Sequence, residues 1–574
     1  MIKEWKLDNF KSIDQEKDLE FRPLTIFTGA NSSGKSTILQ SILLVTQTLQ
    51  SPIASRSIVL NGWFKKFGSY SDVVNRRDNE RNIKIGFTIQ NSGEDGRNDY
   101  YSRFEYDDNI KRTKCEFELS SDGKEECLQP ILEYTRIEAT YGKDKFERTA
   151  VSSVEKKYDR SPEEQEVIET SGSKYQPLDF TYTIKTNFNR IRMGYYGRDE
   201  NLKILGTNLF HFLPNYLIGY SSYKDRMKRA LRECLMSGRS FYFDSEEDFN
   251  RILPIITSKV YAIVDDIYEN KRFRDQEKYE KARNSIKKKI TIPKIIKIIS
   301  LGTLDAIEKM KYVNTVVDTL DTLPEQFITE KVPLYYLTEL EFIRDFFNEK
   351  IKYLGPLREE PRSLYPLENN GNSYDLGLKG ENTAAVFENN KTRKIKYISP
   401  RCFEGGAVSE LKPEEVTLSE AINTWLVYLG VANEMNTNDK GKMGHELKIT
   451  TDIRDMQQDL THVGVGVSQI LPILVMCFLA GKGDSIILEQ SELHLHPKVQ
   501  SRLADFFVSM NALGKQCILE THSEYLINRL RYLVALNDDD QIAQDTMIYF
   551  VEKEKNQGDR NFYTRFYVPE KVCK

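Results

Sequence analysis

The chain has 574 residues, of which 39% are hydrophobic and 29% charged, and its formal net charge is −4. It is too long for one compact core, so about three structural units are expected. The slight excess of acidic residues excludes a uniformly basic protein that coats nucleic acid. Seven cysteines without a C-x-x-C pair argue against a disulfide framework or a zinc knuckle. No signal-peptide core and no apolar run long enough to span a bilayer is found, so a cytoplasmic protein without membrane contact is expected.

A glycine-rich motif near the amino terminus is the strongest indication of function in the sequence. Residues 29–37 match the phosphate-loop pattern G-x-x-x-x-G-K-S, between a strand-like run at 24–27 and apolar residues at helical spacing. Backbone N–H groups of such a loop and of the helix that follows attract phosphate. Lys35 is expected to reach the β- and γ-phosphates of ATP, and Ser36 to ligate Mg²⁺. The predicted ATP-binding residues are Gly29, Ala30, Asn31, Ser32, Ser33, Gly34, Lys35, Ser36 and Thr37.

Beyond this helix the pattern changes from strands to helices. Alternating apolar residues predict an antiparallel β-rich region over residues 82–200, in which the polar stretch 155–175 is expected to be a mobile loop. Residues 220–350 are helical in pattern and highly charged without a sustained heptad repeat, which predicts a short arm. The cations of this arm form either a solvated helix face or a contact with nucleic acid or a partner. They are Lys271, Arg272, Arg274, Lys287, Lys288, Lys289, Lys294 and Lys297.

Two short apolar runs near the carboxyl terminus each end in a polar side chain. The run at 485–489 predicts a buried parallel strand, with Glu489 at the end where ligands bind in α/β sheets. We expect Glu489 to complete the Mg²⁺ shell together with Ser36. The run at 516–522 predicts a second such strand ending at His522, which is suited to bind the γ-phosphate or to orient the attacking water.

A second glycine-containing segment, residues 463–469, precedes an apolar helix. Its amides and its serine hydroxyl suit an anion, although a plain helix N-cap is the alternative. Because residues 29–37 already serve the nucleotide of this chain, we expect this segment to contact a nucleotide bound by another copy, in a dimer with two ATP molecules at the interface. The residues expected to act in trans are Gly464, Gly466, Ser468 and Gln469.

Taken together, these motifs resemble a known group of ATPases. The phosphate loop and the Glu489 strand are about 450 residues apart with a helical arm between them, which is similar to the split head of the SMC/RecF branch of ABC ATPases. Within that branch, five stretches resemble the overcoming-lysogenization-defect (OLD)-like, AAA15-type ATPases: residues 353–358, 380–385, 463–469, 488–497 and 520–523. The resemblance implies an α/β fold: an ABC-type head split between the N- and C-terminal segments, with an antiparallel β lobe and an inserted helical arm. The expected domains are an N-terminal ATPase lobe (1–215), the arm (216–350) and a C-terminal ATPase lobe (351–574).

The resemblance also implies a role in defence against phages. Septu-type ATPase subunits and their retron-associated relatives partner a separate HNH endonuclease, and a reverse transcriptase with its non-coding RNA accompanies the retron systems. We therefore expect a homodimer or higher oligomer, joined through the heads, that binds ATP and controls an effector nuclease. Only roughly fifty residues follow His522, so the Toprim nuclease of OLD proteins is expected to be absent and cutting to come from the partner. The alternative is a RecF-like ATPase that binds DNA during repair.

Gln490 departs from the pattern of most ABC ATPases, which have a water-polarising glutamate directly after the Walker B acid. An amide cannot accept a proton, and loss of a general base slows a reaction by a factor on the order of 10² to 10⁴. ATP hydrolysis is therefore expected to be slow unless Glu492 or His522 substitutes. The predicted catalytic residues are Lys35, Glu489, Gln490, Glu492 and His522.

Overall fold

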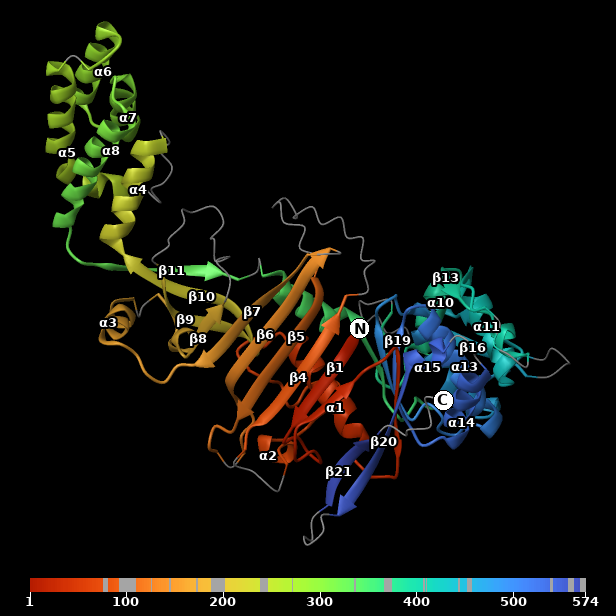
Figure 1. Ribbon diagram of the computed structural model, residues 1–574. Helices are drawn as coiled ribbons and strands as arrows, with labels where there is room; N and C mark the ends of the chain where they lie inside the picture. Colours follow the sequence, from red (N-terminus) through yellow and green to blue (C-terminus); the bar gives the residue numbers. More distant parts are fainter. Residues whose placement is uncertain are drawn as a thin grey trace. The chain divides into compact units, whose positions relative to one another are not determined.

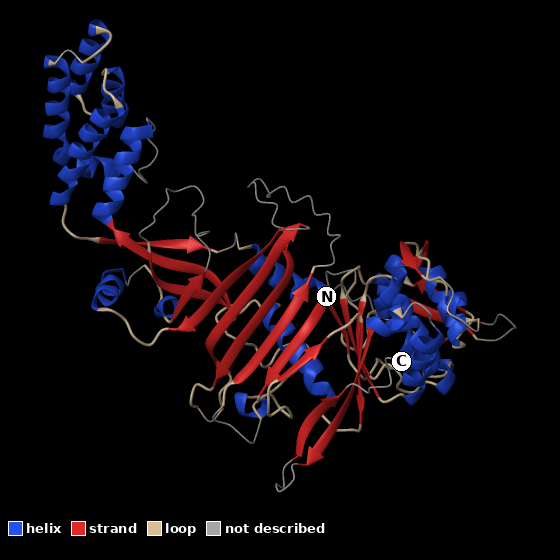
Figure 2. Cartoon of the chain, in the orientation of Figure 1, coloured by secondary structure: helices blue, strands red, loops and turns tan. Residues whose placement is uncertain are grey.

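The computed structural model of the chain divides into two compact units, shown along the sequence in Figure 1 and by secondary structure in Figure 2. The first unit comprises Met1–Ser153, Leu209–Leu213 and Leu337–Lys574, and the second comprises Val154–Asn208 and Pro214–Tyr336. The structure describes residues 1–75, 81–91, 110–124, 126–143, 146–171, 174–186, 202–237, 246–270, 272–334, 337–365, 374–405, 408, 410–441, 444–451, 457–536, 540–555 and 562–567.

A six-stranded sheet in the first unit carries the predicted motifs. Its strand order is β12-β18-β19-β3-β20-β21, and only the last pair is antiparallel. The short apolar runs noted in the sequence are fully buried strands, as expected for a parallel sheet that is covered on both faces. The strands are β3 (Leu24–Gly29), β12 (Ile351–Leu354), β18 (Ser485–Glu489), β19 (Gln516–Thr521), β20 (Thr546–Lys555) and β21 (Phe562–Tyr567).

Six helices of the first unit, α10 to α15, contribute to a large apolar core together with this sheet, and in it Trp425 packs edge-on against Phe506. The helix at residues 418–429 has clear end signals: a capping box of Thr417 and Glu420 begins it, and Gly430 ends it with a φ of 73°. The helices are α1 (Lys35–Leu49), α2 (Tyr70–Val73), α9 (Thr338–Asp345), α10 (Thr383–Asn390), α11 (Leu418–Leu429), α12 (Gly466–Leu479), α13 (Pro497–Ala512), α14 (Glu524–Leu536) and α15 (Gln541–Asp545).

An antiparallel sheet forms the other large part of the first unit, with the order β7-β6-β5-β4-β1-β2. It confirms the β-rich region predicted beyond residue 82. Its strands are β1 (Ile2–Asp8), β2 (Lys17–Glu20), β4 (Ile83–Gln90), β5 (Ile110–Ser120), β6 (Ile131–Lys143) and β7 (Phe146–Lys156). Two small antiparallel sheets complete the unit: β13 (Lys394–Tyr397) with β14 (Glu414–Thr417), and β15 (Glu434–Asp439) with β16 (His445–Thr450) and β17 (Gln457–Asp459).

The second unit holds the helical arm. Five helices share an apolar core that includes Ile256, Tyr279 and Val313, which confirms the inserted arm of the predicted α/β fold. These helices are α4 (Tyr223–Ser237), α5 (Glu246–Glu269), α6 (Gln276–Lys288), α7 (Ile292–Leu301) and α8 (Ala306–Val317). The strands of this unit are β8 (Tyr182–Thr186), β9 (Lys203–Phe210), β10 (Leu213–Ser222) and β11 (Phe327–Pro333). The boundaries predicted at residues 215 and 350 differ from the limits of the compact units and stay a prediction.

The mobile loop predicted for residues 155–175 is wrong over its central part, where the structure has the helix α3 (Pro162–Ser171). The Ser161 hydroxyl accepts a hydrogen bond from the Glu164 amide at 3.2 Å, and the Glu164 carboxylate accepts one from the Ser161 amide at 3.1 Å. This capping box and the proline that follows it start a helix despite the polar composition. Lys271 of the basic run lies outside the described residues. Across the described ranges, no helix combines the length and apolarity needed to cross a membrane.

Candidate functional site

The predicted phosphate loop joins the end of β3 to the start of α1, in the strand–loop–helix arrangement that the sequence indicated. Gly29 and Gly34 have φ values of 143° and 110°, a region that residues with a β-carbon rarely occupy. A β-carbon at Gly29 would lie 2.2 Å from the Val551 carbonyl oxygen, and one at Gly34 would lie 2.6 Å from the Ser12 hydroxyl. Glycine is therefore required at both positions, by the positive φ angles and by the close approach of other segments of the same chain.

Lys35 is the first residue of α1, and its side chain folds back over the loop. Its ammonium donates to the carbonyl oxygens of Ala30 at 2.7 Å and Gly29 at 3.1 Å. Burial lowers the pKa of Lys35, while the carboxylates of Glu520 and Glu492 oppose that shift. The loop thus holds the cation of a phosphate-binding lysine, with two acidic side chains close by.

Ser36 is bound by an acid that the sequence analysis did not single out. Its hydroxyl donates to Oε1 of Glu520 at 2.8 Å, and Oε2 of Glu520 has no hydrogen-bond partner within the described ranges. Burial raises the pKa of Glu520 to about 6, with the charges of Glu489 and Glu492 adding to the rise. The signal was an ionisable residue within the buried strand β19, where an isolated charge is costly unless it has a function.

Glu489 lies at the end of β18, directly beside Glu520 in the register of the two parallel strands. Its Oε1 accepts a 2.9 Å hydrogen bond from the buried Tyr353 hydroxyl, which the sequence analysis also missed. Burial and this carboxylate raise the pKa of Tyr353. In the described part of the chain Ser36 bonds Glu520 and not Glu489, because β19 lies between β18 and β3.

Gln490, Glu492 and His522 surround the same strand ends. Gln490 has a left-handed φ of 47°, and its backbone N–H donates a hydrogen bond to the backbone carbonyl of Glu520 at 2.8 Å. Glu492 accepts the backbone amide of His522 at 2.6 Å, and its second carboxylate oxygen is buried without a hydrogen-bond partner among the described residues. Burial and the nearby Lys35 lower the pKa of His522, whereas Glu492 and a hydrogen bond to the Gly29 carbonyl oppose the shift. The structure therefore brings Lys35, Glu492 and His522 together, with Glu489 and the backbone of Gln490 beside Glu520.

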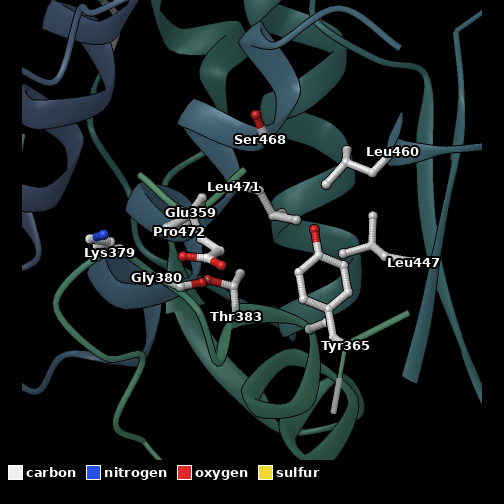
Figure 3. A pocket seen from close by; sticks show the side chains of 11 residues that line it. Glu359, Tyr365, Lys379, Gly380, Thr383, Leu447, Leu460, Ser468, Leu471 and Pro472 are labelled. Carbon is white, nitrogen blue, oxygen red and sulfur yellow. The ribbon is translucent and has the colours of Figure 1, made fainter. Parts of the chain in front are cut away.

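The second glycine-containing segment forms the start of α12. Gly464 and Val465 are exposed, but Ser468 is buried and its hydroxyl donates to the Val465 carbonyl at 2.7 Å within the same turn. Ser468 also borders a pocket that contains Glu359, Gly380 and Pro472 (Figure 3). Residues 464 and 465 are thus the exposed part of this segment, and the serine hydroxyl that the sequence suggested for an anion is hydrogen-bonded within its own chain.

A family model described as an AAA ATPase domain matches residues 1–329 and 340–527, which include every predicted site residue. No curated protein matches the chain.

The chain is also similar to solved Smc head domains at low identity. One is the head domain of Pyrococcus furiosus with an extended coiled coil, bound to the C-terminal domain of ScpA: 12% identity, 100% of this chain and 97% of that chain covered, TM-score 0.32. Another is the head domain from Thermotoga maritima, with 8% identity, 99% of each chain covered and a TM-score of 0.32. A third, with a coiled coil and joint, is from Pyrococcus yayanosii: 13% identity, 99% and 96% covered, TM-score 0.30.

Proposed function

The chain belongs to the AAA ATPase domain family and is therefore an ATPase; from that premise we propose that it is the ATP-driven regulatory subunit of a prokaryotic anti-phage complex. It binds ATP at residues 29–37, hydrolyses it slowly in the cytoplasm and controls a separate effector nuclease of the HNH type. The observation that carries the ATP-binding part is the convergence of Lys35, Ser36, Glu520, Glu492 and His522 on one loop.

The residues present fit Mg²⁺ as well as the triphosphate. Mg²⁺ prefers one or two carboxylates together with waters and substrate phosphates, rather than a closed protein cage. The hydroxyl of Ser36 and the carboxylates of Glu489 and Glu520 are suitable ligands. Oε2 of Glu520 accepts no hydrogen bond from any described residue, so it is available to a metal ion. When bound there, Mg²⁺ would neutralise charge on the β- and γ-phosphates.

Slow ATP hydrolysis is expected because Gln490 occupies the position at which most ABC ATPases have the glutamate that polarises water. The Gln490 amide cannot take a proton from water, so this task falls to a neighbouring group. Glu492 and His522 are the candidates, because each lies within reach of the Lys35 charge. ATP would then act mainly through binding, by favouring one arrangement of the heads over another.

We propose dimerisation or higher assembly through the heads, with residues 464–469 contacting the nucleotide of the other copy. The exposure of Gly464 and Val465 directly before α12 supports it. The HNH partner, and a reverse transcriptase with its RNA in a retron setting, rest on the motif resemblance. The alternative of a RecF-like DNA-binding ATPase rests on the cations of the arm. Part of that run is already used internally, since Lys287 pairs with Asp265 at 3.5 Å and Lys294 donates to the Ser285 and Lys289 carbonyls.

Steady-state phosphate release tests the enzymatic part of this proposal. Wild-type protein should release phosphate slowly, and Lys35→Ala should abolish the release. Lys396→Ala, which removes an exposed lysine of β13, should have no effect. Equal rates for wild type and Lys35→Ala would refute hydrolysis at this loop. Co-purification with the products of flanking genes, with and without ATP, tests the effector partner: an HNH protein supports the defence role, and replication proteins favour the repair alternative.

A further inference from the structure

Arg358 is a buried cation without a hydrogen-bond partner among the described residues. Its side chain is only 7% exposed, and within the described ranges Nε, Nη1 and Nη2 all lack an acceptor. A guanidinium presents five N–H donors in a fixed plane, and leaving them unsatisfied away from water is costly. A buried arginine with a purely structural role would be paired within the fold. The unsatisfied donors of Arg358 therefore indicate that a ligand from outside the chain supplies their acceptors.

The backbone around Arg358 is held firmly at the end of β12. The Gly355 amide donates to the Leu378 carbonyl at 2.9 Å, and the Glu359 amide donates to the Lys379 carbonyl at 2.9 Å. Tyr353, at the start of the same segment, donates its hydroxyl to Glu489. The guanidinium is therefore carried by a short segment that is fixed on both sides and tied to the proposed metal-binding acid.

Arg358 also shares its charged surroundings with the phosphate loop. Burial lowers the pKa of Arg358 to about 10, and Tyr353, Glu489 and Glu492 oppose the shift, so the group remains charged at neutral pH. Glu492 is the acid that also acts on Lys35 and accepts the His522 amide. Neither Glu489 nor Glu492 forms a hydrogen bond with the guanidinium in the part of the chain that the structure describes. The cluster thus has two cations. Lys35 lies over the phosphate loop, and Arg358 follows β12 without a hydrogen-bond partner among the described residues.

We propose that Arg358 binds the terminal phosphate of the nucleotide and makes the site distinguish a nucleoside triphosphate from a diphosphate. This inference rests on the proposed function and adds a residue from the Tyr353–Arg358 segment to the site. A phosphate has the geometry to accept two parallel N–H bonds from a guanidinium. A terminal phosphate between Lys35 and Arg358 supplies the acceptors that Arg358 lacks, and ADP does not reach it.

The stability of the ligand-free protein distinguishes a ligand-binding arginine from a structural one. An arginine that is unpaired until ligand binds should contribute nothing to the ligand-free fold, or should destabilise it. Arg358→Met keeps the apolar stem and removes the unpaired charge, so the ligand-free melting temperature should be unchanged or higher. A structural arginine would give the opposite result.

Calorimetric titration with ADP and with a non-hydrolysable ATP analogue, both with Mg²⁺, tests the inference. Arg358→Met should bind ADP like wild type but bind the analogue at least 10-fold more weakly, on the order expected for losing a charge-assisted pair of hydrogen bonds. Arg358→Lys should fall between, because it keeps the charge and loses the planar fork. The matched control is Arg344→Met, since Arg344 also has an Nε without a hydrogen-bond partner among the described residues but stacks 4.3 Å from the ring centre of Phe210. It should leave both affinities unchanged.

The outcomes separate the inference from the function on which it rests. Wild-type protein that binds neither nucleotide would refute the proposed function. Wild-type binding of both, with an unchanged analogue affinity in Arg358→Met, would refute the role of Arg358 alone. An equal loss of ADP and analogue affinity, together with a lower ligand-free melting temperature, would assign Arg358 to the fold and also overturn the inference.

Discussion

The Ser36 hydroxyl donates a 2.8 Å hydrogen bond to a carboxylate that lies 484 positions later in the chain, Oε1 of Glu520. This contact exists because β19 is the immediate neighbour of β3 in the parallel sheet, while β18 is one strand further away. The acid that bonds the phosphate loop is therefore on the strand that leads to His522, and Glu489 stands behind it with Tyr353 as its donor. This arrangement leads to four predictions.

The first prediction concerns Glu520 and pH. Burial and the neighbouring carboxylates raise its pKa from 4.5 to about 6, so between these values the folded chain binds more protons than the unfolded chain. The free energy of unfolding of the ligand-free protein should therefore fall as pH rises from 4.5 to 6, by about 2 kcal/mol at roughly 1.4 kcal/mol per pKa unit. Glu520→Gln should lose this dependence. Urea unfolding between about pH 4 and pH 7, with a chelator present, measures it.

Glu415→Gln is the matched control, because Glu415 is exposed on β14. Its pH profile should follow that of wild type. Parallel profiles for wild type and Glu520→Gln would contradict the assignment. In the presence of ATP and Mg²⁺, Glu520→Gln should also reduce hydrolysis by a factor on the order of 10², because it removes a carboxylate proposed to hold the Mg²⁺ that neutralises charge on the phosphates.

The second prediction concerns Gln490. Gln490→Glu restores a carboxylate on the same backbone, with nearly the same side-chain shape at the left-handed φ of 47°. If the amide limits turnover, steady-state phosphate release should increase by at least about 10-fold, since a positioned base typically contributes on the order of 10² to 10⁴. Gln457→Glu, which changes an exposed glutamine of β17, should have no effect. An unchanged rate in Gln490→Glu would mean that another step limits turnover.

The third prediction compares two glycines. Gly29→Ala forces a β-carbon to within 2.2 Å of the Val551 carbonyl oxygen at a φ of 143°, which should destabilise the fold by at least about 3 kcal/mol or prevent folding. Gly464→Ala meets nothing within 4 Å among the described residues and should leave stability unchanged. Thermal unfolding of the two variants measures the difference. Equal melting temperatures would contradict the close packing of β3 against β20.

The fourth prediction tests the contact between copies. Val465 is 50% exposed directly before α12, so Val465→Asp places a negative charge where a phosphate of the other copy is expected. The ATP-dependent increase in mass, measured by light scattering with a non-hydrolysable analogue, should be lost. Monomer stability should hold, because an acid at a helix N-terminus is favourable. Val427→Asp changes a similarly exposed valine of α11 (53%) and should assemble normally; assembly of both variants would refute the expected interface.

The sequence was sufficient wherever a local pattern decides the structure. β3, β18 and β19 are short unbroken apolar runs, α11 carries its own capping box, and the glycine positions of the phosphate loop are dictated by backbone angles. Such signals are contained within a few neighbouring residues. α3 also has a local signal, the Ser161–Glu164 cap. The loop prediction there was wrong because it gave more weight to the polar composition of the stretch than to this cap.

The parts of the site that were missed depend on which strands are neighbours. Nothing in the sequence around Glu520 states that its strand lies against β3, so its bond to Ser36 could not be read from spacing. The role of Tyr353 could not be inferred from the motif that contains it, because its partner Glu489 is 136 positions away. The lack of hydrogen bonds at Arg358 within the described chain is a property of packing, which no local pattern of residues encodes.

The position of β3 between β19 and β20 has a consequence for synthesis on the ribosome. The strand that leads into the phosphate loop is made near the start of synthesis, yet both of its neighbours emerge only with the last part of the chain. At about 5–20 residues per second this wait lasts roughly half a minute to two minutes, during which an apolar strand has no partner. A nascent chain thus carries no working ATPase until it is nearly finished, and messages truncated before β20 would yield products with an open strand edge that invites aggregation.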